Sequence, residues 1–419
     1  MRIILVLVLA LAASAQQGVR PKDVREAAKA GPSAMPKLQE YLKDPNVDVR
    51  LEAVKQITEI GPPRSLDPLL EATRDNDPEV LIAATDGLVN FYLPGYVKTG
   101  MTASLRRVGG SIKGRFTDTN DQVIDPFITV RPDVIAALGQ LVATGGSMDA
   151  RANAARAVGI LRAKADLPQL IDATHSKNST LIYEALVAIE KIRDESAGPQ
   201  IAFLLHDFDP KVQIAAIEAV GLLRDNQDLP QLVGVLNKTG NIKVKREALE
   251  AIAMLPAESS QPIYQQYLHD KDDKLRAAAA EGFARLKNPR DLPMLEQAWK
   301  DEQKTSPQLS LAFAQVMLGK TELSEFSPLR FLINNLNSSA YNGIAYPFLV
   351  ELARDPNVRA QLYGPLQTGT REEKIGLARV LGRSGDAQSV AALQKLTEDP
   401  DPNVAQAALT AVRNLQARM

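Results

Sequence analysis

The 419-residue sequence contains no cysteine, only three histidines and one tryptophan, and aromatic residues make up only 5% of it. The lack of cysteine excludes disulfides, Cys-ligated metal or haem, and a thiol for lipid attachment. Hydrophobic residues still reach 45%, and alanine and leucine supply much of this content, which favours helices over sheets. We therefore expect an all-α protein that is indifferent to an oxidising compartment.

Neither sign of charge predominates. The chain carries 49 basic and 50 acidic residues, a formal net charge of -1. No overall positive field would draw nucleic acid or an anionic membrane to the protein. We expect no nucleic-acid partner, and any electrostatic contact with a partner must arise locally.

Long apolar runs are also missing beyond the N-terminus. Residues 1–15 contain one basic residue, an apolar run from Ile3 to Ala13, and the small-x-small pattern Ala13-Ser14-Ala15. This pattern predicts a signal peptide cleaved after Ala15, because the run is well short of the roughly 20 residues of a spanning helix. A retained N-terminal anchor is the alternative. We expect an exported protein, periplasmic or secreted, without a transmembrane segment.

The sequence does contain an internal period. The pentapeptide Asp-Leu-Pro-Gln-Leu occurs at 166–170 and 228–232, and its prolines belong to a series with steps of 31 or 32 residues: Pro168, Pro199, Pro230, Pro262 and Pro293. A second series has an apolar anchor, an alanine four residues later and a larger apolar residue eight residues later, as in Val212, Ala216 and Val220. These spacings place all three on one helix face, with a small residue that lets another helix approach. Each unit is therefore predicted to be a helix, a tight turn and a second helix.

Aspartates occupy the expected starts of both helices. Proline is tolerated in a first helical turn, so the preceding Asp166, Asp228 and Asp291 are predicted to be N-caps of the second helix. Acidic residues between units are interpreted in the same way, as caps and turn residues: Asp44, Asp77, Asp209, Asp272, Asp399 and Asp401.

Helix pairs of this kind cannot bury their apolar faces alone, so they are expected to stack into an α-solenoid. The segments "DPKVQIAAIEAVGLLRD" (209–225), "DDKLRAAAAEGFARLKN" (272–288) and "DPNVAQAALTAVRNLQA" (401–417) resemble the first helix of HEAT repeats. Within that family, they resemble the short bacterial repeats named for phycocyanobilin lyase. This resemblance implies a superhelix of about ten stacked HEAT-like helix pairs.

The predicted organisation follows the strength of the repeats along the chain. It consists of a signal peptide (1–15), N-terminal HEAT-like repeats (16–93), a basic insertion (94–132), central HEAT-like repeats (133–300), degenerate helical repeats (301–369) and C-terminal HEAT-like repeats (370–419).

The insertion breaks the period and is rich in cations. No acidic residue occurs between Asp86 and Asp118. We predict that 95–117 contacts an anionic partner, which could be an acidic protein surface, a glycan or lipid headgroups; the alternative is a packing elaboration or loop whose cations face water. "SIKGRF" and "QVIDPFITV" are candidates for a short β-hairpin. The candidate binding residues are Lys98, Arg106, Arg107, Lys113 and Arg115.

Candidate chemistry is sparse. His175, His206 and His269 each fall seven residues after a proline of the series, where other units have lysine or asparagine. This pattern predicts residues at helix C-termini, near the negative end of the dipole, in preference to metal ligands. HEAT-repeat hydroxylases build a di-iron site from His-Glu dyads, and these histidines are followed by serine or aspartate. We therefore predict no catalytic residues, no metal and no cofactor.

These observations favour an exported, non-enzymatic scaffold that binds another macromolecule, most simply a protein, through its concave face, its basic insertion or both. One alternative is a lyase-like enzyme or enzyme accessory that holds a small ligand or chromophore. Another is a structural protein of the cell envelope.

Overall fold

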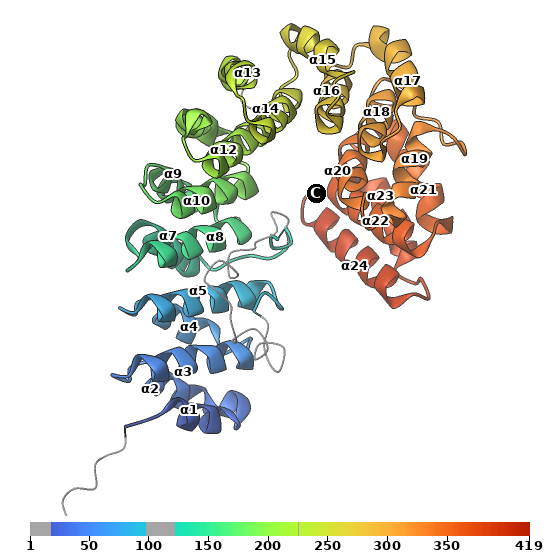
Figure 1. The fold of residues 1–419 in the computed structure, drawn as a ribbon. Helices are drawn as coiled ribbons and strands as arrows, with labels where there is room; N and C mark the ends of the chain where they lie inside the picture. Colours follow the sequence, from blue (N-terminus) through green and yellow to red (C-terminus); the bar gives the residue numbers. More distant parts are fainter. Residues whose placement is uncertain (1–17, 98–121, 225) are drawn as a thin grey trace, which may run out of the picture.

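The computed structural model describes residues 18–97, 122–224 and 226–419, and in these ranges it contains helices and no β-strand. The helices follow one another along a curved path (Figure 1). The path rises from α1 to α14, bends at α15 and α16, and returns so that α24 lies opposite α8 and α10. We call α1–α14 the first arm and α18–α24 the return arm. The predicted all-α solenoid is confirmed.

The helices alternate between two layers. The inner layer faces the space between the two arms. Each of its helices packs against the next inner helix along the path. Their bounds are α1 (Pro21–Ala28), α3 (Val47–Ile60), α5 (Pro78–Tyr92), α8 (Met148–Ile160), α10 (Ser179–Ile192), α12 (Pro210–Leu223), α14 (Ile242–Met254), α16 (Asp273–Leu286), α18 (Thr305–Met317), α20 (Asn342–Leu352), α22 (Arg371–Ser384) and α24 (Pro402–Gln416).

The outer layer consists of the second helix of each pair. Its helices are α2 (Met35–Tyr41), α4 (Leu66–Ala72), α7 (Pro132–Thr144), α9 (Leu167–Thr174), α11 (Gly198–Ile201), α13 (Leu229–Lys238), α15 (Gln261–Tyr267), α17 (Leu292–Asp301), α19 (Pro328–Asn334), α21 (Pro356–Thr368) and α23 (Ala387–Leu396). The alternation continues through 301–369, where the sequence repeat is degenerate.

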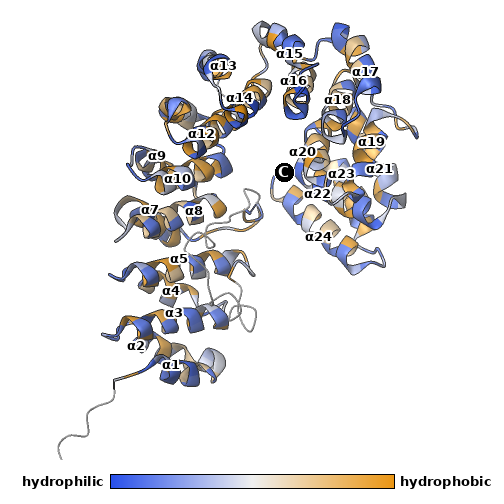
Figure 2. Cartoon of the chain, in the orientation of Figure 1, coloured by the Kyte–Doolittle hydropathy of each residue, from blue (hydrophilic) through white to orange (hydrophobic). Residues whose placement is uncertain are grey.

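The core lies between the two layers, where apolar residues gather along the helix contacts (Figure 2). Val212, Ala216 and Val220 are almost fully buried, as their spacing predicts. Inner helices approach so closely that a Cβ added at Gly221 would lie 2.8 Å from the Cα of Ala251. Small residues in the repeat therefore set the distance between neighbouring inner helices.

Aspartate caps are confirmed at the inner helices. The carboxylates of Asp77, Asp209, Asp272 and Asp401 accept hydrogen bonds from the first backbone N–H groups of α5, α12, α16 and α24. Each of these residues has extended backbone with ψ between 111° and 126°. This conformation turns the side chain toward the free N–H groups of the helix start.

The predicted capping bonds of the outer helices are wrong. Asp166, Asp228 and Asp291 occupy the N-cap positions of α9, α13 and α17, but none makes a side-chain capping bond. Each closes a short 3-10 turn, and its ψ is 9°, -5° or -10°. With ψ near zero these residues lack the extended backbone of a side-chain cap, and all three are buried.

The end of the insertion ties the arms together. Residues 122–130 form no strand, so the expected β-hairpin strand is absent there. The backbone N–H of Ile124 donates to the Ile160 carbonyl at the end of α8, and the Asp125 carboxylate accepts from Asn414 of α24 at 3.1 Å. The backbone N–H of Ile124 is thus bound to α8 and is not available to a hairpin partner. Within the described ranges, no helix combines the length and apolar character needed to cross a bilayer.

Candidate ligand-binding site between the two arms

Two adjoining cavities of about 530 Å³ and 760 Å³ lie between the first arm and the return arm. The first arm contributes Arg162 to both cavities, and Arg193 lines the smaller one. The return arm contributes Tyr346, Arg379 and Arg383 to both. Shared lining residues show that the two cavities form one continuous hollow, and we call Arg162, Arg193, Arg379 and Arg383 the inter-arm arginine cluster.

The arginines of the first arm occupy an unusual backbone conformation. Arg162, Arg193 and Arg224 directly follow or lie just after the ends of α8, α10 and α12, with φ of 48°, 58° and 58°, and Lys287 follows α16 with φ of 55°. In the part of the chain that the structure describes, these four are the non-glycine residues with positive φ. Glycine normally takes this position after a helix, because a side chain there costs about 1 kcal/mol. The nearby helix C-terminus recovers about 0.3–1 kcal/mol for a cation.

Within the part of the chain that the structure describes, the inter-arm arginines form no ion pair with a carboxylate. The Nε of Arg162 is buried without a hydrogen-bond partner among the described residues. Partial burial and the nearby charges of Arg383 and Arg193 lower the pKa of Arg162. Partial desolvation in the hollow and the charge of Arg383 also lower the pKa of Arg193, although the charge of Glu190 opposes this shift. Arg383 on one arm thus faces like charges on the other, and all remain protonated.

The return arm is braced by a residue from the chain's end. Arg418 donates from its guanidinium to the carbonyl oxygens of Gly382 and Arg383 at the end of α22. Together with the Asp125–Asn414 hydrogen bond, this contact fixes the end of α24 beside the hollow. The backbone at Gly382 and Arg383 is therefore held by hydrogen bonds from Arg418.

The smaller cavity combines excess positive charge with apolar surface. Five cationic residues line it against two carboxylates, those of Glu190 and Glu372, so its lining carries a net charge of +3. Tyr346, Ile375 and Leu336 supply apolar surface among the charges. A cavity of this kind suits a ligand that carries several negative charges and some apolar surface.

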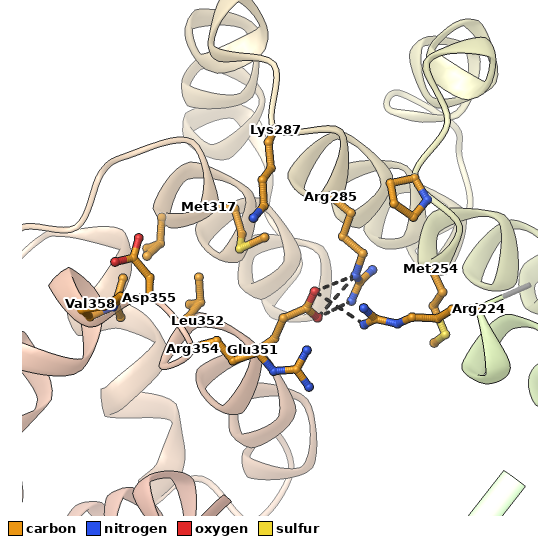
Figure 3. Close-up of a pocket in the computed structure, with 13 residues that line it drawn as sticks. Arg224, Met254, Arg285, Lys287, Met317, Glu351, Leu352, Arg354, Asp355 and Val358 are labelled. Atoms are coloured by element: carbon orange, nitrogen blue, oxygen red, sulfur yellow. Dashed lines mark hydrogen bonds and ion pairs between the residues drawn. The ribbon is translucent and has the colours of Figure 1, made fainter. Parts of the chain in front are cut away.

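A third cavity of about 570 Å³ lies at the bend and is different in character. Figure 3 shows Arg285 and Arg224 pointing at the carboxylate of Glu351. Arg285 pairs with Glu351 at 3.0 Å and with Glu281 at 3.2 Å, while Arg224 lies 3.9 Å from Glu351. Burial alone would raise the pKa of Glu351, but Arg285 holds it below its usual range. This network joins α16 to α20 across the bend.

Acidic residues line the inner helices between the inter-arm hollow and the cavity at the bend. Burial and repulsion by Glu250 and other carboxylates raise the pKa of Glu247 on α14 to about 9. Burial and the charge of Glu281 raise the pKa of Glu250 to about 7. Protonation near neutral pH reduces the negative charge of this row. Within the described residues, no group of three or more His, Asp or Glu side chains is arranged to hold a metal ion.

None of the candidate site residues predicted from the sequence is among the described residues that line this hollow. The insertion residues Lys98, Arg106, Arg107, Lys113 and Arg115 all lie outside the described residues. The histidines lie at or just past helix ends: His175 is the C-cap of α9, His206 ends the 3-10 turn Ala202–His206, and His269 follows α15. The His175 ring stacks on Phe203, with centroids 4.6 Å apart.

Sequence reasoning missed the inter-arm arginine cluster. A signal was present, because Arg162, Arg193 and Arg224 are spaced by 31 residues in the slot just after the first helix of each unit. An arginine recurring where glycine is favoured would have marked this edge of the inner layer. Its approach to Arg379 and Arg383 could not be inferred, because it depends on the bend between the arms.

Several solved structures are similar to the chain at low identity. An engineered protein is 18% identical, with a TM-score of 0.39, over 91% of this chain and 98% of its own. The YibA protein of Escherichia coli is 16% identical, with a TM-score of 0.43, over 70% and 94%. The CpcE–CpcF complex of phycocyanin lyase from a Nostoc species is 16% identical, with a TM-score of 0.40, over 65% and 94%. At these scores the likenesses say nothing about function.

A family model supports the repeat assignment directly. No curated protein matches the chain. The family model of HEAT repeats matches residues 4–97 and 235–313. The matched segments contain the same alternation of inner and outer helices as the rest of the solenoid. The resemblance to HEAT repeats that the repeated sequence predicts is confirmed for these two segments of the chain.

Proposed function

We propose that this protein is an exported, non-enzymatic scaffold that binds another macromolecule, most simply a protein, in the hollow between its arms. The observation that carries the proposal is the inter-arm arginine cluster, in which four arginines line a hollow without carboxylate partners among the described residues. Keeping like charges together is unfavourable in the free protein. A bound partner with complementary charge would relieve that repulsion.

The solenoid architecture supports this role. Stacked helix pairs offer a long inner surface, and side chains on it can change without disturbing the core between the layers. In the hollow, Tyr346 and Ile375 lie among the arginines, which provides the mix of apolar and charged groups typical of protein interfaces.

Site-specific photo-crosslinking in native cells would test the binding surface. A photoreactive phenylalanine analogue at Tyr346, which lines the hollow, is expected to capture a partner. The matched control is the same analogue at Phe326, whose side chain is 84% exposed in the turn before α19. A partner captured only from Phe326, or from neither position, would contradict binding in the hollow.

Export is tested separately. We expect N-terminal sequencing of protein isolated from native cells to begin at Gln16, in a periplasmic or culture-medium fraction. A chain that retains residues 1–15 in the membrane fraction would indicate an anchored protein, and an uncleaved chain in the cytoplasm would overturn export.

A further inference from the structure

We infer that the inter-arm arginine cluster binds an acidic polypeptide segment, with its carboxylates on Arg162, Arg193 and Arg383. This inference rests on the proposed function and names the chemistry of the partner. Three conditions must hold. The arginines must be free to bind a ligand, and the hollow must suit a polypeptide. The arginines must also contribute something other than stability.

The arginines are available for a ligand. Arg193, Arg379 and Arg383 are exposed to solvent within the hollow, and no acidic side chain of the described residues pairs with them. Elsewhere the protein does pair its arginines, as in the bidentate contact of Arg276 with Glu302 at 2.7 and 3.0 Å. An arginine fork binds a carboxylate in this way, with two parallel hydrogen bonds. The cluster thus offers several such forks that the fold itself leaves open.

The shape and lining of the hollow favour a polypeptide. The two cavities adjoin and extend between helices of both arms, so a flat membrane surface cannot reach the arginines at their centre. Apolar groups such as Ile375 and Tyr346 lie among the charges, where the aliphatic parts of a peptide can pack. A sulfated glycan has no comparable apolar groups. An extended segment with alternating acidic and apolar residues matches both features.

The backbone conformation of Arg162 and Arg193 shows whether these residues serve binding or stability. Arg162 and Arg193 have φ of 48° and 58°, so glycine would fit each position with less strain. Glycine would also remove the repulsion from Arg383 that lowers the pKa of both arginines. If these side chains served only to end their helices, glycine would serve better. We expect the glycine variants to be at least as stable as the natural protein and to bind acidic peptide less well.

Fluorescence anisotropy on the full mature chain tests the inference. The probe is a short labelled peptide of alternating glutamate and leucine, and its matched control replaces glutamate by glutamine. We expect the acidic peptide to bind at low salt, more weakly as salt rises. Each of Arg193→Gly and Arg383→Gln should weaken binding by about tenfold, in line with the loss of a charged hydrogen bond. Arg74→Ala removes an exposed arginine on the first arm, outside the hollow, and should leave binding unchanged.

Thermal unfolding of the same variants and competition by small anions complete the test. Arg193→Gly should keep or raise the melting temperature. Equal binding of the glutamate and glutamine peptides, or unchanged binding by the variants, would overturn the inference. So would binding of citrate or pyrophosphate without binding of the peptide. If crosslinking from Tyr346 captures a partner while the acidic peptide fails to bind, the proposed function stands and this inference alone fails.

Discussion

Asp166 offers the sharpest test of how this solenoid is stabilised, because sequence and structure assign it opposite effects. As an N-cap it would stabilise α9. In the structure it is 4% exposed, its Oδ2 has no hydrogen-bond partner among the described residues, and burial raises its pKa from 3.8 to about 6. A carboxyl group with a raised folded-state pKa opposes folding once it is ionised.

The size of the effect follows from that shift. A rise of about 2 pKa units at about 1.4 kcal/mol each gives a penalty of about 3 kcal/mol above pH 6. The positive end of α9 offsets up to about 1 kcal/mol, which leaves about 2 kcal/mol. Below about pH 4 the group is protonated in both folded and unfolded chains, so the penalty disappears. Stability should therefore fall as the pH rises through the window from about 4 to 6.

Asp166→Asn removes the ionisation and keeps the shape. We expect the variant to be more stable than the natural protein by about 1–2 kcal/mol near pH 8, since the new amide donor also lacks a partner, and to lose this advantage near pH 4. Urea unfolding followed by circular dichroism across this range measures the difference. A difference that does not change with pH would refute the reasoning.

Asp401→Asn provides a control of opposite sign. Backbone hydrogen bonds, first from Asn403, hold the pKa of Asp401 below 3.8. A lowered pKa stabilises the folded state above the unfolded-state pKa, and this contribution is lost as the pH falls. The asparagine variant should thus lose stability near pH 8 and match the natural protein in acid.

Three further predictions concern packing, the bend and the insertion. Gly282→Ala should cost about 1–3 kcal/mol in urea unfolding, because its Cβ would lie 2.3 Å from the ring of buried Tyr264, while Gly234→Ala, with no atom within 4 Å, should be neutral or stabilising. Glu351→Gln should lower the free energy of unfolding by about 3 kcal/mol, because Arg285 keeps only Glu281 as a charged partner. Small-angle scattering should show a change in the angle between the arms, and an unchanged profile would mean that the network does not set this angle. Replacing the five insertion cations with glutamine should abolish salt-sensitive capture of partners if 95–117 binds an anionic surface, whereas unchanged capture at low salt would sink that prediction.

The periodic part of the fold could be predicted because it depends on neighbours in sequence. Anchors such as Val212 and Val220 face the core because helical spacing puts them there. Caps such as Asp209 depend on the backbone of one turn. The same logic failed at Asp166, where a preceding 3-10 turn changed ψ and turned an expected cap into a buried carboxylate.

The candidate site could not be predicted in the same way. Arg162 and Arg383 are 221 positions apart in sequence, and they meet only because the solenoid bends by an amount that no single repeat specifies. Contacts at the bend, such as the one between Arg285 and Glu351, join units that are not adjacent along the chain. Local patterns therefore identify the surface on which arginines recur, while the global curvature decides which of them converge.

The core packing and the arginines of the hollow are separate parts of the structure. The hollow can therefore bind a partner without a loss of stability in the solenoid. The core between the layers fixes the helices, so the arginines that follow the inner helices can be exchanged one at a time, and glycine at these positions removes a backbone strain of about 1 kcal/mol each. The glycine variants at Arg162 and Arg193 make the trade explicit, because they should move stability and peptide binding in opposite directions. Substitution of a residue that serves packing would reduce both stability and peptide binding. Substitution of a residue that serves a ligand reduces peptide binding alone.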